Sequence, residues 1–126
     1  MFVHLNIHSI YSKMRSILTL EELMILNKSQ QTVALTDINT VRGFINFVQF
    51  AKSNNMAPIA GVNLITNVDE IIILVENDIG YENMCSIITN YYANPNCSAV
   101  EFLKENIYLR LLLILCPINN TYKLMN

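Results

Sequence analysis

The stretch TVALTDINTVRGFINFVQFAKSNNMAPIAGVNLI, Thr32 to Ile65, decides the fold class of this 126-residue chain. Its first part, TVALTD, is an apolar run that ends in Thr36 and Asp37, which is typical of a strand that runs into a loop. The middle part, FINFVQFAKSNN, repeats its apolar residues at helical spacing. The last part, APIAGVNLI, is a second apolar run. The stretch therefore predicts a strand–helix–strand unit.

Similar patterns flank this unit on both sides. We expect further strands at residues 1–8, 70–77 and 108–116, helices at 19–30 and 78–92, and a short helix within 93–106. Two pairs of residues stand at capping-box spacing, Thr19 with Glu22 and Ser98 with Glu101, and each pair indicates a helix start. Strands that alternate with helices predict one α/β domain over residues 1–126, built on a mainly parallel sheet or barrel of about five strands.

The composition suits one packed domain and argues against several classes of protein. Hydrophobic residues make up 52% of the chain and charged residues only 14%, which is below the usual quarter. The net charge is −2 and the basic residues are scattered, so we expect no direct binding of nucleic acid by this segment. No apolar run reaches the about 20 residues that span a bilayer, and no signal-peptide pattern opens the chain. We expect a cytoplasmic protein with no membrane partner.

The cysteines give no sign of a disulfide framework or a zinc site. Cys85, Cys97 and Cys116 are odd in number and lack the CxxC spacing of a zinc knuckle. We expect them to be reduced thiols.

Polar side chains follow the first three expected strands. His8 lies in NIHS after the first strand, Asp37 lies in TDIN after the second, and Asn63 lies in GVNL at the third. Because the carboxyl ends of parallel strands meet at one edge of a sheet or barrel, we expect these segments to converge on one rim, where the chemistry of such folds is placed. His4 is one step out of phase with this rim, so we expect it at the surface.

Five short motifs, taken in order, resemble one known family. They are LNIHSIYS (residues 5–12), ALTDIN (34–39), VRGFINFVQFAKSNNM (41–56), APIAGVNL (57–64) and EIIILVENDIGYENMCSI (70–87). Each motif alone is weak, but the set at these intervals resembles the PHP (polymerase and histidinol phosphatase) domain of bacterial C-family DNA polymerase III alpha subunits. The likeness is strongest to the degenerate form found in some low-GC Gram-positive bacteria. It implies a distorted (β/α)7 barrel, of which this chain supplies a part.

The resemblance also implies a metal site that this sequence has largely lost. Intact members of the family hold two or three divalent metals through His, Asp, Glu and Cys side chains at strand ends. The corresponding positions here are Asn6, His8, Arg15, Ile38 and Asn63. Only His8 keeps a ligand of the family type. Asp37 corresponds to a residue that supports the ligands by hydrogen bonding.

Arg15 is the departure that argues most strongly against a metal. At ~4 Å, a like-charge contact costs about 4 kcal/mol per unit charge at an effective dielectric near 20, and about twice that against a divalent ion. Arginine cannot lose its proton to relieve this repulsion. If Arg15 points inward, we expect it to pair with Asp37 and to fill the emptied site. We therefore expect no metal cofactor.

For function, the resemblance implies DNA replication and a non-catalytic structural and interaction platform. Its partners would be the remainder of the polymerase alpha subunit or replisome proteins, and polymerization would reside outside this chain. The alternative is a metal-dependent phosphoesterase or 3′–5′ exonuclease that uses His8 and Asp37 with Zn²⁺ or Mn²⁺. A complete stand-alone binding protein is a third hypothesis. Because a partial barrel leaves a strand edge uncovered, we also expect self-association through that edge.

Overall fold

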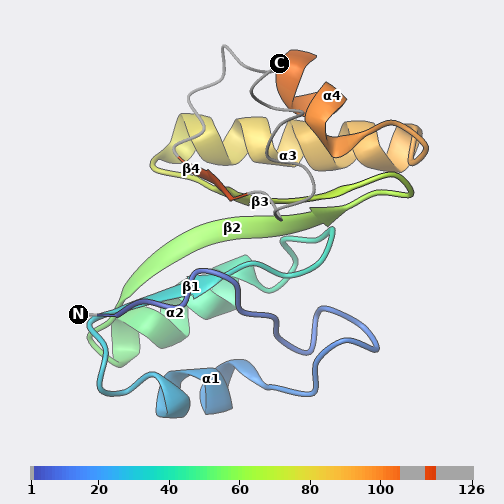
Figure 1. The fold of residues 1–126 in the computed structure, drawn as a ribbon. Coiled ribbons are helices and arrows are strands. Elements are labelled where there is room, and N and C mark those ends of the chain that lie inside the picture. Colours follow the sequence, from blue (N-terminus) through green and yellow to red (C-terminus); the bar gives the residue numbers. More distant parts are fainter. Residues whose placement is uncertain (1, 106–112, 116–126) are drawn as a thin grey trace.

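The computed structural model describes residues 2–105 and 113–115, which form helices packed against a four-stranded sheet (Figure 1). The elements in chain order are α1 (Leu20–Leu26), β1 (Thr32–Leu35), α2 (Phe44–Ser53), β2 (Ala57–Ile65), β3 (Glu70–Leu74), α3 (Asp78–Ala93), α4 (Ala99–Glu105) and β4 (Leu113–Leu115). The α/β class is confirmed. No helix in this described part of the chain has the length and apolar character that a membrane span requires.

The strands lie in the order β1-β2-β3-β4, and only the first pair is parallel. β2 runs antiparallel to β3, and β3 runs antiparallel to β4. The expectation of a mainly parallel sheet is therefore wrong for the described strands. The reason is the connection between β2 and β3, which consists only of residues 66–69, whereas a parallel crossover needs about a dozen residues or more.

The expected first strand is not formed within residues 2–8. This segment still runs beside the end of β1, because the backbone N–H of Thr36 donates to the carbonyl of Ile7 at 2.8 Å. The return bond comes from Ile7 N–H to the hydroxyl of Thr36 at 2.9 Å, where a backbone carbonyl would be needed to continue a ladder. The expected strand at 108–116 is seen only as β4, and its other residues lie outside the described part.

The predicted capping box is complete at the start of α1 and half formed at the start of α4. At α1, the Thr19 hydroxyl accepts from Glu22 N–H at 3.2 Å and the Glu22 carboxylate accepts from Thr19 N–H at 2.9 Å. At α4, the Glu101 carboxylate accepts from Ser98 N–H at 3.4 Å. The Ser98 hydroxyl instead donates to Asp69, so that box is only half formed.

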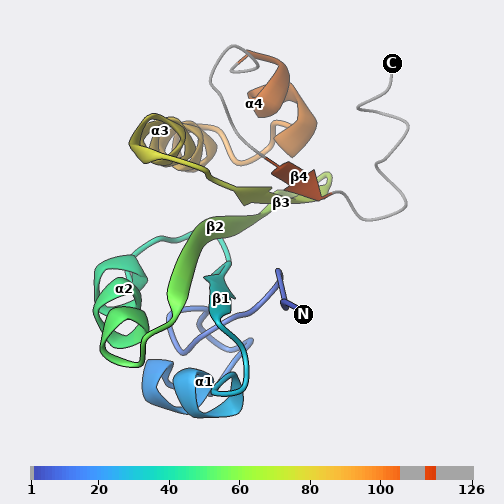
Figure 2. The same cartoon turned by 90° about the vertical axis from the view of Figure 1, so that its left-hand side faces the viewer.

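Two apolar clusters hold the helices on the sheet. One joins β2 and β3 to α3 and α4, and the other joins β1 to α1 and α2. Figure 2 shows these two helix pairs gathered at opposite parts of the sheet. Val62 and Leu64 of β2 point into the first cluster. Because side chains alternate along a strand, Asn63 points from the opposite face, and that face carries the candidate site.

Candidate functional site

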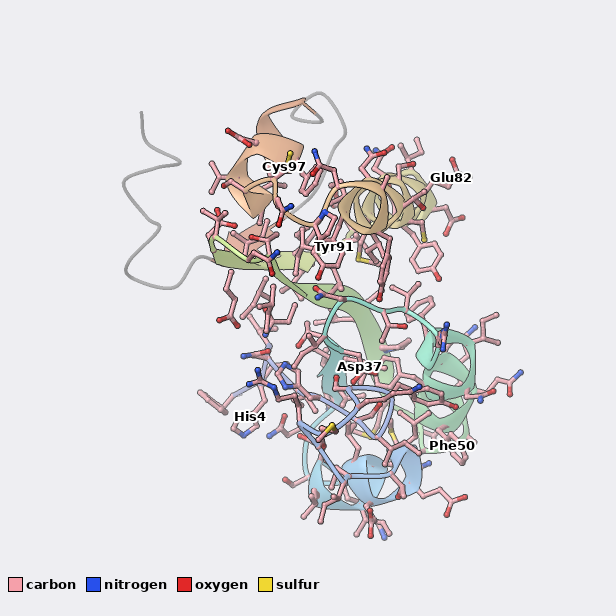
Figure 3. The ribbon with its side chains drawn as sticks, turned by 90° about the vertical axis from the view of Figure 1, so that its right-hand side faces the viewer. His4, Asp37, Phe50, Glu82, Tyr91 and Cys97 are labelled. Atoms are coloured by element: carbon pink, nitrogen blue, oxygen red, sulfur yellow. The ribbon has the colours of Figure 1, made fainter. Side chains whose placement is uncertain are left out.

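Asp37 ties the loop after the first segment to the end of β1. Its side chain is only 1% exposed and lies inside the molecule (Figure 3). One carboxylate oxygen accepts from Ser9 N–H at 2.6 Å and from the Ser12 hydroxyl at 2.7 Å, and the other accepts from the Ser9 hydroxyl at 2.7 Å. The Ser12 hydroxyl in turn accepts from Ile38 N–H at 2.9 Å. Hydrogen bonds to a charged acceptor are stronger than neutral ones, so Asp37 makes a rigid clasp.

His8 and Asn63 come together on the face of the sheet opposite the cluster that contains Val62 and Leu64. The side-chain nitrogen Nδ2 of Asn63 lies 3.3 Å from Nε2 of His8 and donates to Oε1 of Glu70 at 2.8 Å. An amide NH₂ has two donors, so one of them can donate to Nε2 of His8 when that ring nitrogen carries no proton. Oδ1 of Asn63 is buried without a hydrogen-bond partner among the described residues. The three side chains form a chain of hydrogen bonds from the amino-terminal segment to β3.

Ile38 and Asn6 lie at the same rim but make different contacts. Ile38 forms an isolated parallel bridge with Asn63, in which Asn63 N–H donates to the carbonyl of Asp37 at 3.1 Å. The Oδ1 atom of Asn6 accepts from the Thr36 hydroxyl at 3.1 Å. The predicted convergence of the three segments on one rim is therefore what the structure shows.

Arg15 does not take part in this rim. It is exposed, and within residues 2–105 it forms no ion pair with Asp37, whose oxygens are already occupied by Ser9 and Ser12. The condition for its pairing with Asp37, an inward-pointing side chain, is therefore not met. A turn explains the outward position: Arg15 N–H donates to the carbonyl of Ser12 at 3.0 Å, and Met14 adopts a φ of 61°. An outward guanidinium also keeps its hydration.

His4, Cys85 and Cys97 lie away from this rim. His4 is exposed as expected and stands at the periphery, where its ring meets Phe2 edge-on at 4.7 Å between centroids (Figure 3). Cys85 and Cys97 are free thiols, and Cys116 lies outside the described residues.

The described side chains do not fit a divalent metal by themselves. Among residues 2–103 no group of three or more His, Cys, Asp or Glu residues lies close enough to hold an ion. One of the two ring nitrogens through which His8 could bind a metal, Nε2, is in contact with an amide nitrogen. The oxygens of Asp37 already accept hydrogen bonds from three donors. Any chemistry that needs a metal would have to break these contacts first.

Two acidic residues that no sequence motif indicates, Asp69 and Glu70, also make structural contacts. Glu70 takes part in the chain from His8, and its only sequence signal is its place on the strand face that also carries Asn63. Asp69 is buried at the turn between β2 and β3, where burial opposes its ionisation. Hydrogen bonds from Ser98, Ala99, Thr66 and Val100 outweigh that effect and hold the pKa of Asp69 below its usual range. Asp69 thereby fastens the start of α4 to the sheet.

Comparison with known proteins places the chain in a family. The PHP domain family matches residues 4–115, so the chain belongs to that family. Three relatives are DNA polymerase III alpha subunits. The Ureaplasma parvum protein is 42% identical over 64 residues, which cover 49% of this chain and 7% of the relative. The Buchnera aphidicola protein is 33% identical over 100 residues, which cover 72% and 9%. The Staphylococcus aureus protein is 29% identical over 119 residues, which cover 86% and 11%.

Solved structures support the same fold. An amidohydrolase from Chromobacterium violaceum, solved with bound sulfate and no metal, gives a TM-score of 0.58 at 16% identity and covers 82% of this chain and 36% of its own. A protein from Bifidobacterium adolescentis, described as a proposed metal-dependent phosphoesterase, gives 0.54 at 16% identity and covers 72% and 32%. The described fold is thus part of a PHP-type barrel. The chain spans about a tenth or less of the polymerase subunits that it matches (7%, 9% and 11%).

Proposed function

We propose that this chain acts in DNA replication as a non-catalytic structural and interaction platform within a DNA polymerase III alpha subunit. The contact between Asn63 Nδ2 and His8 Nε2 carries the proposal, because it places a hydrogen-bond donor where a metal would need a lone pair. The family membership and the polymerase relatives support the replication context. The platform would work in the cytoplasm, without a cofactor and without direct binding of nucleic acid by this segment.

The partners proposed are the remainder of the alpha subunit or other replisome proteins. The loop that follows His8 presents apolar side chains to solvent: Ile10 is 47% exposed, Ile17 is 94% exposed and Met14 is fully exposed. Clustered apolar exposure is typical of a surface that another protein covers. Self-association through an uncovered sheet edge remains part of the same proposal.

The alternative is a metal-dependent phosphoesterase or exonuclease that uses His8 and Asp37. That reading requires Asp37 to give up hydrogen bonds from Ser9 and Ser12 at 2.6 to 2.7 Å. It also requires the Asn63 amide to leave His8. No contact in the described part favours this arrangement over the platform.

Metal content is the experiment that tests the proposal. Untagged protein dialysed against excess Zn²⁺ and Mn²⁺ is expected to retain less than one ion per chain by elemental analysis. The combined substitution of Asn6→His, Ile38→His and Asn63→Glu is expected to raise the retained metal, because it returns imidazole and carboxylate donors to the rim. One or more tightly held ions in the natural sequence, lost in His8→Ala and kept in His4→Ala, would establish the alternative.

A further inference from the structure

A pocket that adjoins the rim at Ile38 lies where three distant segments meet. It has a volume of about 360 Å³ and is lined by Tyr11 and Lys13 of the first loop, by residues 38–40 and Arg42 after β1, and by Tyr92 of α3. Its size falls at the small end of the range of ligand sites, about 300–1,000 Å³. The His8, Asp37 and Asn63 side chains do not line it.

The two tyrosine rings of the pocket are held in place. The Tyr92 side chain is 65% exposed, yet its hydroxyl donates to the backbone carbonyl of Asn39 at 2.9 Å. Tyr11 packs on Gly43, where a Cβ atom would lie only 2.5 Å from the ring. The Asn46 amide donates to the Tyr11 hydroxyl at 3.4 Å. Rings fixed in this way present flat faces without the entropy cost of ordering them on binding.

The backbone beneath the pocket is equally ordered. Asn39 adopts a φ of 54°, and its side chain exchanges two hydrogen bonds with the backbone of Ile65, at 2.8 and 2.9 Å. An amide side chain tolerates the left-handed conformation better than most residues do. The loop after β1 is thereby fastened to β2, so the pocket floor is preformed.

The charge of the pocket is positive although the chain as a whole carries −2. Lys13 and Arg42 line it, and no acidic residue does. The helix α2 begins directly after Arg42 and Gly43, with no side-chain cap and no acidic residue in its first turn. The amino-terminal end of a helix carries a partial positive charge that favours anions. Two cations and an uncapped helix end therefore lie next to two aromatic faces.

We infer that this pocket binds a single nucleotide, with its phosphate held by Lys13 and Arg42 and its base stacked on Tyr11 or Tyr92. A phosphate alone would use the cations and leave the rings without a role. An apolar ligand would leave two cations unpaired. A single nucleotide fits better than a strand, because the pocket is compact and the described basic residues form no continuous stripe along which a backbone could run.

Equilibrium dialysis with radiolabelled dAMP, adenosine and inorganic phosphate tests this inference on the 126-residue protein. We expect dAMP to bind about tenfold or more tightly than either fragment, because only the nucleotide uses both the cations and the rings. The double variant Lys13→Gln with Arg42→Gln should weaken dAMP binding by tenfold or more, ~10² at low salt. At least one of the single variants Tyr11→Leu and Tyr92→Leu should weaken dAMP binding and leave phosphate binding unchanged.

A matched control separates the pocket from general electrostatics. The double variant Lys28→Gln with Lys52→Gln removes the same charge from two exposed residues outside the pocket. It should bind dAMP within about twofold of the natural sequence. Equal losses in both double variants, or no dAMP binding at ~1 mM, would overturn the inference. A tetranucleotide that binds more tightly than dAMP would overturn the assignment to a single nucleotide. Far-UV circular dichroism of each variant confirms that the fold is retained.

Discussion

The side-chain nitrogen of Asn63 lies 3.3 Å from Nε2 of His8, and the same nitrogen donates to Glu70 at 2.8 Å. A neutral amide thus links an imidazole and a carboxylate on the sheet face opposite Val62 and Leu64. In intact members of the family, the counterparts of Asn63 and His8 are expected to hold metal. Here they join the amino-terminal segment to β2 and β3, which gives this pair a structural role.

We predict that Asn63→Ala destabilises the protein by about 1–3 kcal/mol, since it removes a buried amide whose nitrogen contacts the half-buried side chains of His8 and Glu70. Urea unfolding followed by circular dichroism measures this change. Asn90→Ala, at an exposed position of α3, should change stability by no more than about 0.5 kcal/mol. Equal effects of the two substitutions would show that the contact with His8 is not stabilising.

We predict a larger loss of stability when the hydrogen bonds to Asp37 are weakened. Asp37→Asn keeps the size of the side chain but removes a charged acceptor that serves Ser9 and Ser12. We expect a loss of about 2–4 kcal/mol, because hydrogen bonds to charged groups contribute more than neutral ones and a buried donor is left without a partner. The exposed Asp78→Asn in the first turn of α3 is the control and should cost about 0.3–1 kcal/mol. A melting temperature of Asp37→Asn within the range of the control would contradict the clasp.

The sequence predicts those parts of the fold that depend on local signals. β2 occupies the predicted residues 57–65, and the capping box at Thr19 begins α1 as expected, because strand pattern and cap chemistry act over a few residues. The direction in which the strands pair was predicted wrongly. The connection of only four residues, 66–69, makes β2 and β3 antiparallel, but the alternation of strands and helices along the rest of the chain favoured a parallel sheet.

The candidate site was predictable only in part, because some of its contacts join residues that are distant in the sequence. The ends of the strands pointed to His8, Asp37 and Asn63, and the structure brings them to one rim. The partners that occupy Asp37 were not predictable, since Ser9 and Ser12 become neighbours of Asp37 only after folding. The outward turn at Arg15 depends on a left-handed Met14, which no sequence pattern signals. The positive pocket likewise joins residues that are about 80 positions apart in the chain, from Tyr11 to Tyr92.

A pH dependence follows from Asp69. Burial opposes its charge, but hydrogen bonds from Ser98 and Ala99 dominate and keep its pKa below the ordinary value of 3.8. A carboxyl with a lowered pKa in the folded state contributes stability that is fully present above the unfolded value and is lost as the pH falls through the folded value. We therefore expect the free energy of unfolding to decrease below about pH 4.

The Asp69→Asn variant isolates this contribution. It should be less stable than the natural sequence at pH 7, and the difference between the two should shrink at pH 3, which lies below the ordinary value of 3.8, because the unfolded state then gains a proton. Urea unfolding at both pH values measures it. A difference that stays constant between pH 7 and pH 3 would mean that the charge of Asp69 does not stabilise the start of α4.

The exposed loop between His8 and Thr19 is a second surface, besides the sheet edge, that we expect to contribute to association. Met14 and Ile17 are almost completely exposed, at 102% and 94%, and such apolar groups gain free energy when a second protein covers them. Met14→Ser with Ile17→Ser should lower the weight-average mass in sedimentation velocity and leave the melting temperature unchanged, because neither side chain packs in the fold. Ile45→Ser with Ile79→Ser, at exposed positions of α2 and α3, is the matched control and should not change the mass. Association that persists in the loop variant would contradict a role of the loop and would favour the edges of the described sheet, β1 and β4, as the contact.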